Sequence, residues 1–412
     1  MPVKRAKTAL YVILFIFIIS NKSLSDNLIY SGFSLQGNFS DSSLNYPMFS
    51  KFLEDNNTIN EKLFQLLNGE SNIEFQKSSD NNGKVVSFGL LTENINYSII
   101  NNFLKGEFML YPQVFIYDND TKNFLSSHST RLLFRIATEI DPSQNPEDIL
   151  IKRYKDKLLN NKAEITYKGR CVDEPQIKLT FIQIYKELFN CQHIKDVDRF
   201  NLQVRNVDLG KSQYGKFSFT ENNDQHLSAM KYKLANLATA AVSSLTYNNR
   251  FLVLPHSKEQ SIANVQSRFS DTMNITINLP EPDFVLDLKI NGSIKKKLAE
   301  DEDEAIYMYA IGINFKILEP YSDTLIFDSD FKFAKKKEFA KDLSSMQVIQ
   351  TEENDYYLYN QLFEELIADF SSNLLVEKLT NVNKKWLKKY SNNSSSYDKS
   401  IKMHKNIVNT FF

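Results

Sequence analysis

Three long segments of alternating apolar and polar residues in the second half of the chain constrain its fold most. Residues 284–294, 307–318 and 324–333 each alternate as strands do, and the turn-forming residues 319–323 join the second segment to the third. Alternation with a period of two places the apolar side chains on one face of a sheet. An amphipathic helix predicted over residues 356–380 can cover that face. We therefore expect an antiparallel sheet packed against helices.

The first half of the chain shows a related plan. Its pattern predicts strands at residues 28–35, 84–91, 109–117 and 124–140, and helices at 59–67 and 95–104. The hairpin predicted at residues 113–135 resembles the one at 314–336, since each has an aromatic strand, an Asp-rich turn and a long return strand. The fold class predicted is α/β, in the α+β sense, with two domains that each pack a small mixed or antiparallel sheet against helices.

Breaks in these patterns suggest where the domains begin and end. The segment 141–146 contains two prolines and ends the first pattern, and helices are expected on both sides of residue 170 and over residues 259–272. The predicted divisions are a signal peptide at 1–25, an N-terminal α/β domain at 26–145, a helical connector at 146–195, a C-terminal α/β domain at 196–380 and a basic polar tail at 381–412.

The N-terminus has the features of a secretory signal. Lys4, Arg5 and Lys7 precede an apolar run at residues 9–19, and Ser23-Leu24-Ser25 fits the small-x-small pattern before a cleavage site. About eleven apolar residues are too few to span a bilayer, which takes roughly 20. We expect a mature chain that begins near residue 26, has no transmembrane segment and works in the periplasm or as a secreted protein.

Composition excludes some partner classes. Lysine and arginine total 49 against 50 for aspartate and glutamate, so the chain has no overall basic field that would attract nucleic acid. The 31 phenylalanines and 20 tyrosines predict an aromatic-rich core. Any charged partner must therefore recognise a local surface.

Two cysteines, Cys171 and Cys191, are the whole thiol content of the chain. In an oxidising compartment they can pair and close a loop of about twenty residues, which the chain-entropy model values at about 3 kcal/mol. Two free thiols are the other alternative that the spacing leaves open. Zinc is disfavoured because only His193 would join the two cysteines, and a structural site needs four ligands.

The motifs of common enzymes are missing from the sequence. His128 lies in the run Ser126-Ser127-His128-Ser129-Thr130, but neighbours on one strand point to opposite faces, which disfavours a catalytic pair. The acidic run at residues 300–304 follows the lysines of 295–297, and a solvated hairpin tip that balances its own charge is favoured over a calcium site. We predict no catalytic, cofactor-binding or metal-binding residues and no cofactor.

The C-terminal tail holds the best local candidate for an interaction. Basic residues beside an aromatic anchor can hold a segment on an anionic membrane surface. A frayed, solvated tail is the alternative, and the pattern favours it. The candidate interaction residues are Lys384, Lys385, Trp386, Lys388 and Lys389.

The order of elements within residues 230–380 resembles the periplasmic α/β domain shared by the curli secretion channel protein and by accessory proteins of flagellar and exopolysaccharide assembly. One match is a strand after a helix, with Arg250, Phe251, Val253 and Leu254. The others are the strand that begins Asp283-Phe284-Val285-Leu286 and the turn at 319–325, which lacks the glycine of that family. The resemblance implies an α/β fold and a partner-binding envelope protein.

These observations predict a non-enzymatic, exported binding or assembly accessory protein of a cell-envelope machine. Its expected partners are envelope proteins, a second copy in a homo-oligomer, or an anionic membrane surface contacted by the tail, but not nucleic acid. Exposed sheet edges and the hairpin tips near 118–123 and 295–304 are the expected contact points. One rival is an exported hydrolase with a site of dispersed carboxylates, and another is a protein tethered at the membrane surface.

Overall fold

The computed structural model describes about two thirds of the chain. The described residues are 28–36, 46, 48–49, 58–68, 83–100, 102–141, 143–159, 179–190, 200–210, 237–246, 251–256, 264–269, 274–302, 304–340 and 355–412. The predicted signal peptide and both cysteines lie outside them, so export and the pairing of the cysteines stay predictions.

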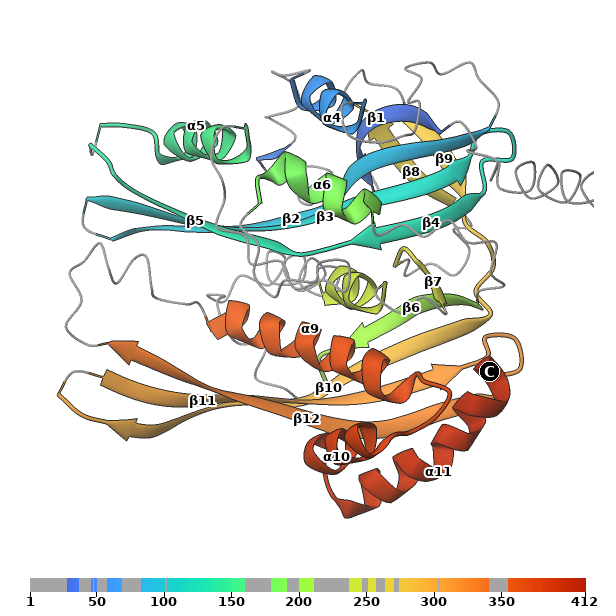
Figure 1. Cartoon of the computed structure of the whole chain (residues 1–412). Helices are drawn as coiled ribbons and strands as arrows, with labels where there is room; N and C mark the ends of the chain where they lie inside the picture. The colour runs from blue at the N-terminus through green and yellow to red at the C-terminus, as the bar shows by residue number, and fades with distance from the viewer. Residues whose placement is uncertain are drawn as a thin grey trace, which may run out of the picture.

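Two mixed β-sheets form the framework, which confirms the α+β fold class (Figure 1). The first sheet has the strand order β4-β3-β2-β1-β8-β9. The strand β5 also pairs with β3, along a different stretch of β3 from the one that pairs with β4. Its strands are β1 (Ile29–Gln36), β2 (Lys84–Ile100), β3 (Phe103–Asp118), β4 (Phe124–Ser129), β5 (Leu132–Glu139), β8 (Asn264–Phe269) and β9 (Asn274–Asn278).

The second sheet has the order β12-β11-β10-β6-β7. In it β6 is parallel to both β10 and β7, and the other pairs are antiparallel. Its strands are β6 (Phe200–Asp208), β7 (Phe251–Leu254), β10 (Phe284–Glu300), β11 (Glu304–Leu318) and β12 (Leu325–Ala340). The three alternating segments that constrain the fold most are thus neighbouring strands, as predicted.

Helices cover the apolar faces of both sheets (Figure 1). We call the first sheet with its helices the first module, and the second sheet with its helices the second module. The helices of the first module are α4 (Thr58–Asn68), α5 (Pro146–Leu159) and α6 (Phe181–Asn190). Those of the second are a helical segment within residues 237–246, α9 (Asp355–Leu374), α10 (Asn381–Tyr390) and α11 (Ser394–Phe411).

Aromatic rings fill both cores, as the composition predicted. In the first module Phe88 packs against Tyr30 and Tyr185, with ring centroids 5.7 Å apart in each pair. In the second, Phe370 of α9 stacks on Phe315 of β11 at 4.2 Å. Both sets of side chains are fully or almost fully buried, so each sheet and its helices share one core.

The two modules repeat the same irregularities. In each, the first strand has one extra residue at the same point of its parallel pairing: Tyr30 and Phe33 face Val86 and Phe88, as Val204 and Val207 face Leu286 and Leu288. A second extra residue follows Leu90 in β2 and Ile290 in β10. Such bulges change the local twist and are specific features of a fold, so their repetition indicates one plan used twice.

The hairpin turns also match. The backbone N–H of Asp118 donates to the carbonyl of Asn123 at 2.9 Å, and that of Glu319 donates to the carbonyl of Thr324 at 3.0 Å. In both six-residue turns the fifth residue is left-handed, with φ of 56° at Lys122 and 51° at Asp323. The resemblance between hairpins 113–135 and 314–336 therefore extends to backbone conformation.

The modules are joined by pairing and by a buried polar contact. The hairpin β8–β9 comes from the second half of the chain but completes the first sheet, where β8 pairs with β1. Between the sheets, Glu364 of α9 accepts a hydrogen bond from the hydroxyl of Tyr111 at 2.9 Å and pairs with Arg131 at 2.7 Å. Burial raises the pKa of Glu364, and the positive charge of Arg131 opposes that effect.

Two expectations about local structure are wrong. Residues 95–104, predicted to be helical, continue β2 and begin β3, and the described part of 259–272 forms β8. Sheet pairing overrides local helical spacing in both cases. The strands β8 and β9 belong to the first sheet, although they lie within the residues 196–380 of the predicted C-terminal domain; the domain division itself stays a prediction.

Candidate functional site: a projecting ribbon and a basic helix pair

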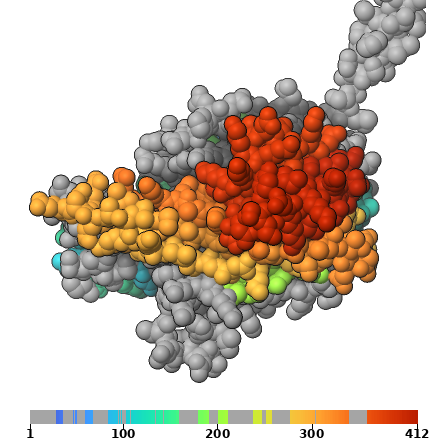
Figure 2. Space-filling view, turned by 90° about the horizontal axis from the view of Figure 1, so that it is seen from below, coloured from blue at the N-terminus to red at the C-terminus, as the bar shows by residue number. Residues whose placement is uncertain are grey.

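The distal halves of β10, β11 and β12 form a ribbon that extends past the helices (Figures 1 and 2). β10 pairs with β6 only from Phe284 to Lys289, and its side chains are exposed or half-exposed from Asn291 onward. Ile294 is 59% exposed and Leu298 is 41% exposed. We call residues 291–310 and 334–340 the ribbon.

Lysines on the two outer strands of the ribbon flank the central strand. The register places Lys295, Tyr309 and Lys335 in one row, and the ammonium group of Lys295 lies 5.0 Å and 5.4 Å from the rings of Tyr307 and Tyr309. A cation–π contact at an exposed site stabilises this arrangement by about 0.5–1 kcal/mol. Lys296, Met308 and Lys336 form the next row, on the opposite face.

The end of the ribbon is acidic, as the sequence suggested. Lys297 pairs with Glu300, and the backbone N–H of Glu304 donates to the Asp301 carboxylate at 2.7 Å to close the turn. The pair with Glu300 raises the pKa of Lys297. A basic band therefore adjoins an acidic tip, and the two nearly cancel in net charge.

Closer to the core of the second module, the charged and polar side chains on the sheet face that carries Ile294 are paired with one another. Arg205 donates two hydrogen bonds to the Asp287 carboxylate, one of them at 2.9 Å. Asn314 donates to Asp328 at 2.9 Å, and Asn291 donates to Asp330 at 2.8 Å. The contrast with exposed Ile294 and Leu298 makes the ribbon the part of this face suited to contact with another molecule.

The candidate interaction residues of the tail lie on a folded helix, so the expectation of a frayed tail is wrong. A capping box at Thr380 and Asn383 begins α10. Trp386 is only 9% exposed, contacts Phe331 and Tyr390, and donates to the Asp369 carboxylate at 3.1 Å. Trp386 is therefore part of the core and is unavailable as a surface anchor.

The lysines around Trp386 remain on the surface. Burial of Trp386 and Leu387 fixes the inner face of α10, and this rotation exposes the four lysines. The ammonium group of Lys389 lies 4.6 Å from the ring of Tyr390. The exposed lysines of α10 are Lys384, Lys385, Lys388 and Lys389.

The serine and histidine run lies on β4 and is buried. His128 faces Val114 in the register and thus the helices of the first module, whereas Ser127 faces Phe115 and the second sheet. Gln113 donates a hydrogen bond to Ser127. Because Ser127 and His128 lie on opposite faces, the structure separates this serine from the imidazole.

Glu93, at the bulge of β2, is a buried carboxylate that sequence analysis missed. Its Oε2 accepts the backbone N–H groups of Met48 and Phe49, each at 2.9 Å, and Tyr154 donates to Oε1. Burial raises the pKa of Glu93 to about 7, although these three donors favour the ionised form. Position 93 lies between Thr92 and Asn94 in a polar stretch, so no local signal marked it as buried.

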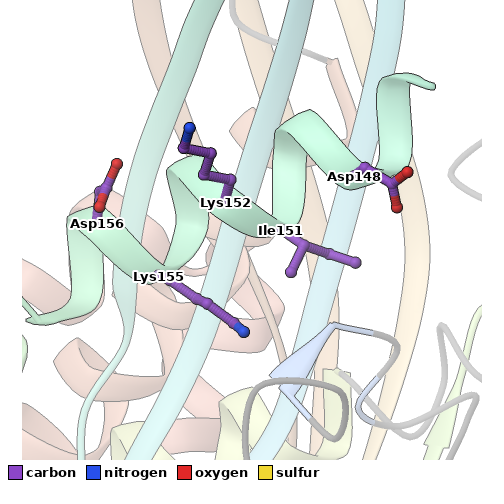
Figure 3. Close-up of a pocket in the computed structure, with 5 residues that line it drawn as sticks. All are labelled: Asp148, Ile151, Lys152, Lys155 and Asp156. Atoms are coloured by element: carbon purple, nitrogen blue, oxygen red, sulfur yellow. The ribbon is translucent and has the colours of Figure 1, made fainter. Parts of the chain in front are cut away.

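A hollow of about 300 Å³ lies beside α5, but its side chains do not converge. Figure 3 shows that Lys152 and Asp156 point away from Ile151 and Lys155. Within the described part of the chain, no group of three histidine, cysteine, aspartate or glutamate side chains could hold a metal ion. Nor does any helix there have the length and apolar character needed to cross a membrane.

In the structure, the described residues of the motifs that carry the family resemblance form two strands and a turn. Phe251, Val253 and Leu254 belong to β7, and Phe284, Val285 and Leu286 begin β10. The turn at 319–324 joins β11 to β12. These residues have structural roles, and the relationship to that family stays a prediction.

Comparison with known proteins identifies no family. No family model and no curated protein matches this chain. A putative neuraminyllactose-binding hemagglutinin homolog from Helicobacter pylori is 13% identical over 47% of this chain and 93% of its own, with a TM-score of 0.23. A hypothetical protein from Chlamydia trachomatis is 9% identical (42% and 97%, TM-score 0.23), and a minor lipoprotein from Acinetobacter baumannii is 9% identical (43% and 91%, TM-score 0.19). At these TM-scores the likeness carries no inference about function.

Proposed function

We propose that this chain is a non-enzymatic, exported binding or assembly accessory protein of the cell envelope, and that it contacts a partner protein through the ribbon. The observation that carries this proposal is the exposure of Ile294 and Leu298 on strands that have left the cover of the helices. Their burial against a partner would remove apolar surface from water, which is the main driving force of association.

The chemistry of the ribbon supports a protein partner. Among the described residues, the outer edges of β10 and β12 in the ribbon pair with no further strand, so they can accept an added strand, and the lysines of the ribbon discourage pairing between two identical edges. Lys335 is held by Glu365 of α9 at 2.6 Å, which anchors the base of the ribbon to the second module. A ribbon fixed at its base presents side chains without a large loss of entropy on binding.

Site-specific photo-crosslinking in cells tests this proposal. A benzophenone amino acid replaces Ile294 in one variant and Tyr321 in the control, which is 73% exposed in the turn at the opposite end of β11. We expect the Ile294 variant to form a discrete crosslinked species with another protein and the Tyr321 variant to form none. Equal crosslinking at both positions, or none at either, would contradict the proposal.

A substitution then tests whether the apolar patch makes the contact. Ile294→Lys should abolish the crosslinked species formed from a second probe at Leu298 while leaving thermal unfolding unchanged, because Ile294 is largely solvent-exposed. The matched control is Tyr321→Lys. A Leu298 crosslink that survives Ile294→Lys would show that the partner does not use this apolar patch.

A further inference from the structure

The helix pair α10–α11 concentrates the positive charge of this chain. Residues 381–412 contain seven lysines and one aspartate, Asp398, whereas the whole chain has a net charge of −1. The excess of six positive charges is therefore offset by negative charge elsewhere in the chain. All seven lysines are exposed. Such a local field attracts anionic partners even though the chain as a whole is nearly neutral.

The fold presents this charge on a raised surface. Figure 2 shows the helices of the C-terminal segment, in red, as a convex mass beside the strands of the second sheet. The pair is firmly attached: Phe411 packs against Phe284 with ring centroids 4.7 Å apart, and Ser400 donates to Ser329 at 2.9 Å. A rigid convex surface suits a broad partner better than a small ligand, which needs a concave site.

Helix stability explains only part of the lysine distribution. Lys388 and Lys389 lie in the last turn of α10, where the helix dipole favours positive charge. Lys384 and Lys385 lie nearer the N-terminal end, where the dipole gives no such stabilisation. Neither forms an ion pair among the described residues. Val382, 71% exposed, sits beside them. These three side chains contribute little to the fold and remain available for contact.

The residue types of this surface favour an anionic membrane over an acidic protein as its partner. Tight protein interfaces rely on arginine, tyrosine and tryptophan, and lysine is depleted at their centres. Residues 381–412 contain no arginine, and their tryptophan is buried. Lysine acts as a flexible point charge, which suits a diffuse layer of phosphate groups better than paired carboxylates. An exposed aliphatic side chain among lysines completes the pattern of a membrane-surface contact.

We propose that α10 and α11 bind the surface of an anionic phospholipid bilayer, with Lys384 and Lys385 at the phosphate layer and Val382 at the lipid interface. The contact is peripheral and reversible, and it falls with added salt because it depends on several lysines rather than on an inserted anchor. It is separate from the ribbon, so one molecule can hold a partner protein while it rests on a membrane.

Vesicle sedimentation with the full mature chain tests the charge requirement. The probe is a vesicle of phosphatidylcholine with 30% phosphatidylglycerol, and pure phosphatidylcholine is the neutral control. Each lysine near an anionic surface contributes about fivefold to binding, so K384E/K385E should bind at least about 20-fold more weakly than the wild type. The matched variant K152E/R153E makes the same change in net charge on exposed residues of α5 and should bind like the wild type.

Fluorescence tests the position of Val382. The chain has one tryptophan, Trp386, and its burial provides a constant signal that also reports on folding. In V382W, anionic vesicles should shift the emission to shorter wavelength, whereas Y321W should show no shift. The proposal is overturned if the wild type ignores anionic vesicles at low salt, if the two charge variants lose binding equally, or if V382W shows no shift while bound. Crosslinking at the ribbon is unaffected by any of these outcomes.

Discussion

The two modules place the same bulge in different environments. In the first module the bulge after Leu90 leads to Glu93, which is buried beneath Met48, Phe49 and Tyr154. In the second, the bulge after Ile290 leads to Ser293, beyond which β10 leaves the helices and becomes the ribbon. The framework therefore fixes backbone geometry, and the segments that cover it decide how deeply a position is buried.

The helix pair is a second difference. The first module covers its sheet with α4, α5 and α6, and the second uses the segment 237–246, α9 and parts of α11 in the same way. The basic face of α10 and α11 has no counterpart in the described part of the first module. The paired strands are repeated in both modules, and the difference in the helices that cover them provides the two surfaces for which we propose partners.

Substitution at equivalent core positions gives the largest expected effect. Phe88 and Leu288 follow the same bulge in the two parallel pairings and are both buried. F88A and L288A should each lower the free energy of unfolding, by about 4 and about 3 kcal/mol, because each leaves a cavity. Urea unfolding should show one transition in both variants, since β8–β9 and Glu364 connect the modules. Two separate transitions would mean that the modules fold independently.

The buried carboxylate of Glu93 predicts a dependence on pH that the equivalent position of the second module, Ser293, does not give. The pKa of Glu93 is about 7 in the folded protein, above the 4.5 of an exposed glutamate, so the folded state binds the proton more tightly. Its contribution is complete below pH 4.5 and is lost as pH rises through about 7. The wild type should therefore lose about 3 kcal/mol more than E93Q between pH 4.5 and 8.

Ser293 provides the control for that measurement, because it occupies the equivalent position without a titratable group. S293A should keep the pH dependence of the wild type. A dependence that persists in E93Q would assign it to other groups.

The contact between the modules should have an intermediate effect. E364Q keeps an acceptor for Tyr111 but removes the charge that faces Arg131, and we expect a loss of about 1–3 kcal/mol in unfolding free energy. E365Q, one residue along α9, affects only the more exposed pair with Lys335 and should cost less than about 0.5 kcal/mol. Equal losses would show that Glu364 does not act between the modules.

The matched turns predict the smallest change. Lys122 and Asp323 both have left-handed backbones, which glycine adopts without strain. K122G should stabilise the protein by up to about 1 kcal/mol, and D323G by less, because aspartate tolerates this conformation better than lysine. Thermal unfolding measures both, and destabilisation by K122G would indicate that its side chain, not its backbone, matters at this turn.

Local patterns predicted much of the secondary structure because the relevant interactions are near in sequence. The alternation in β10, β11 and β12 and the turn-forming residues at 118–123 and 319–324 predicted strands and hairpins. The predictions for 95–104 and 259–272 failed where long-range pairing outweighs helical spacing. No sequence pattern announces that β8 will pair with β1, more than two hundred residues away.

For the candidate sites too, the sequence identified some residues and only the tertiary structure identified the others. The sequence alone identified the lysines of residues 384–389 and the charged hairpin at 295–304, since runs of charge stay at the surface of most folds. Only the tertiary structure decided that Trp386 is buried, that Val382 and Ile294 are exposed, and that Glu93 is enclosed. Burial depends on which segments pack together, and that is a property of the whole chain rather than of neighbouring residues.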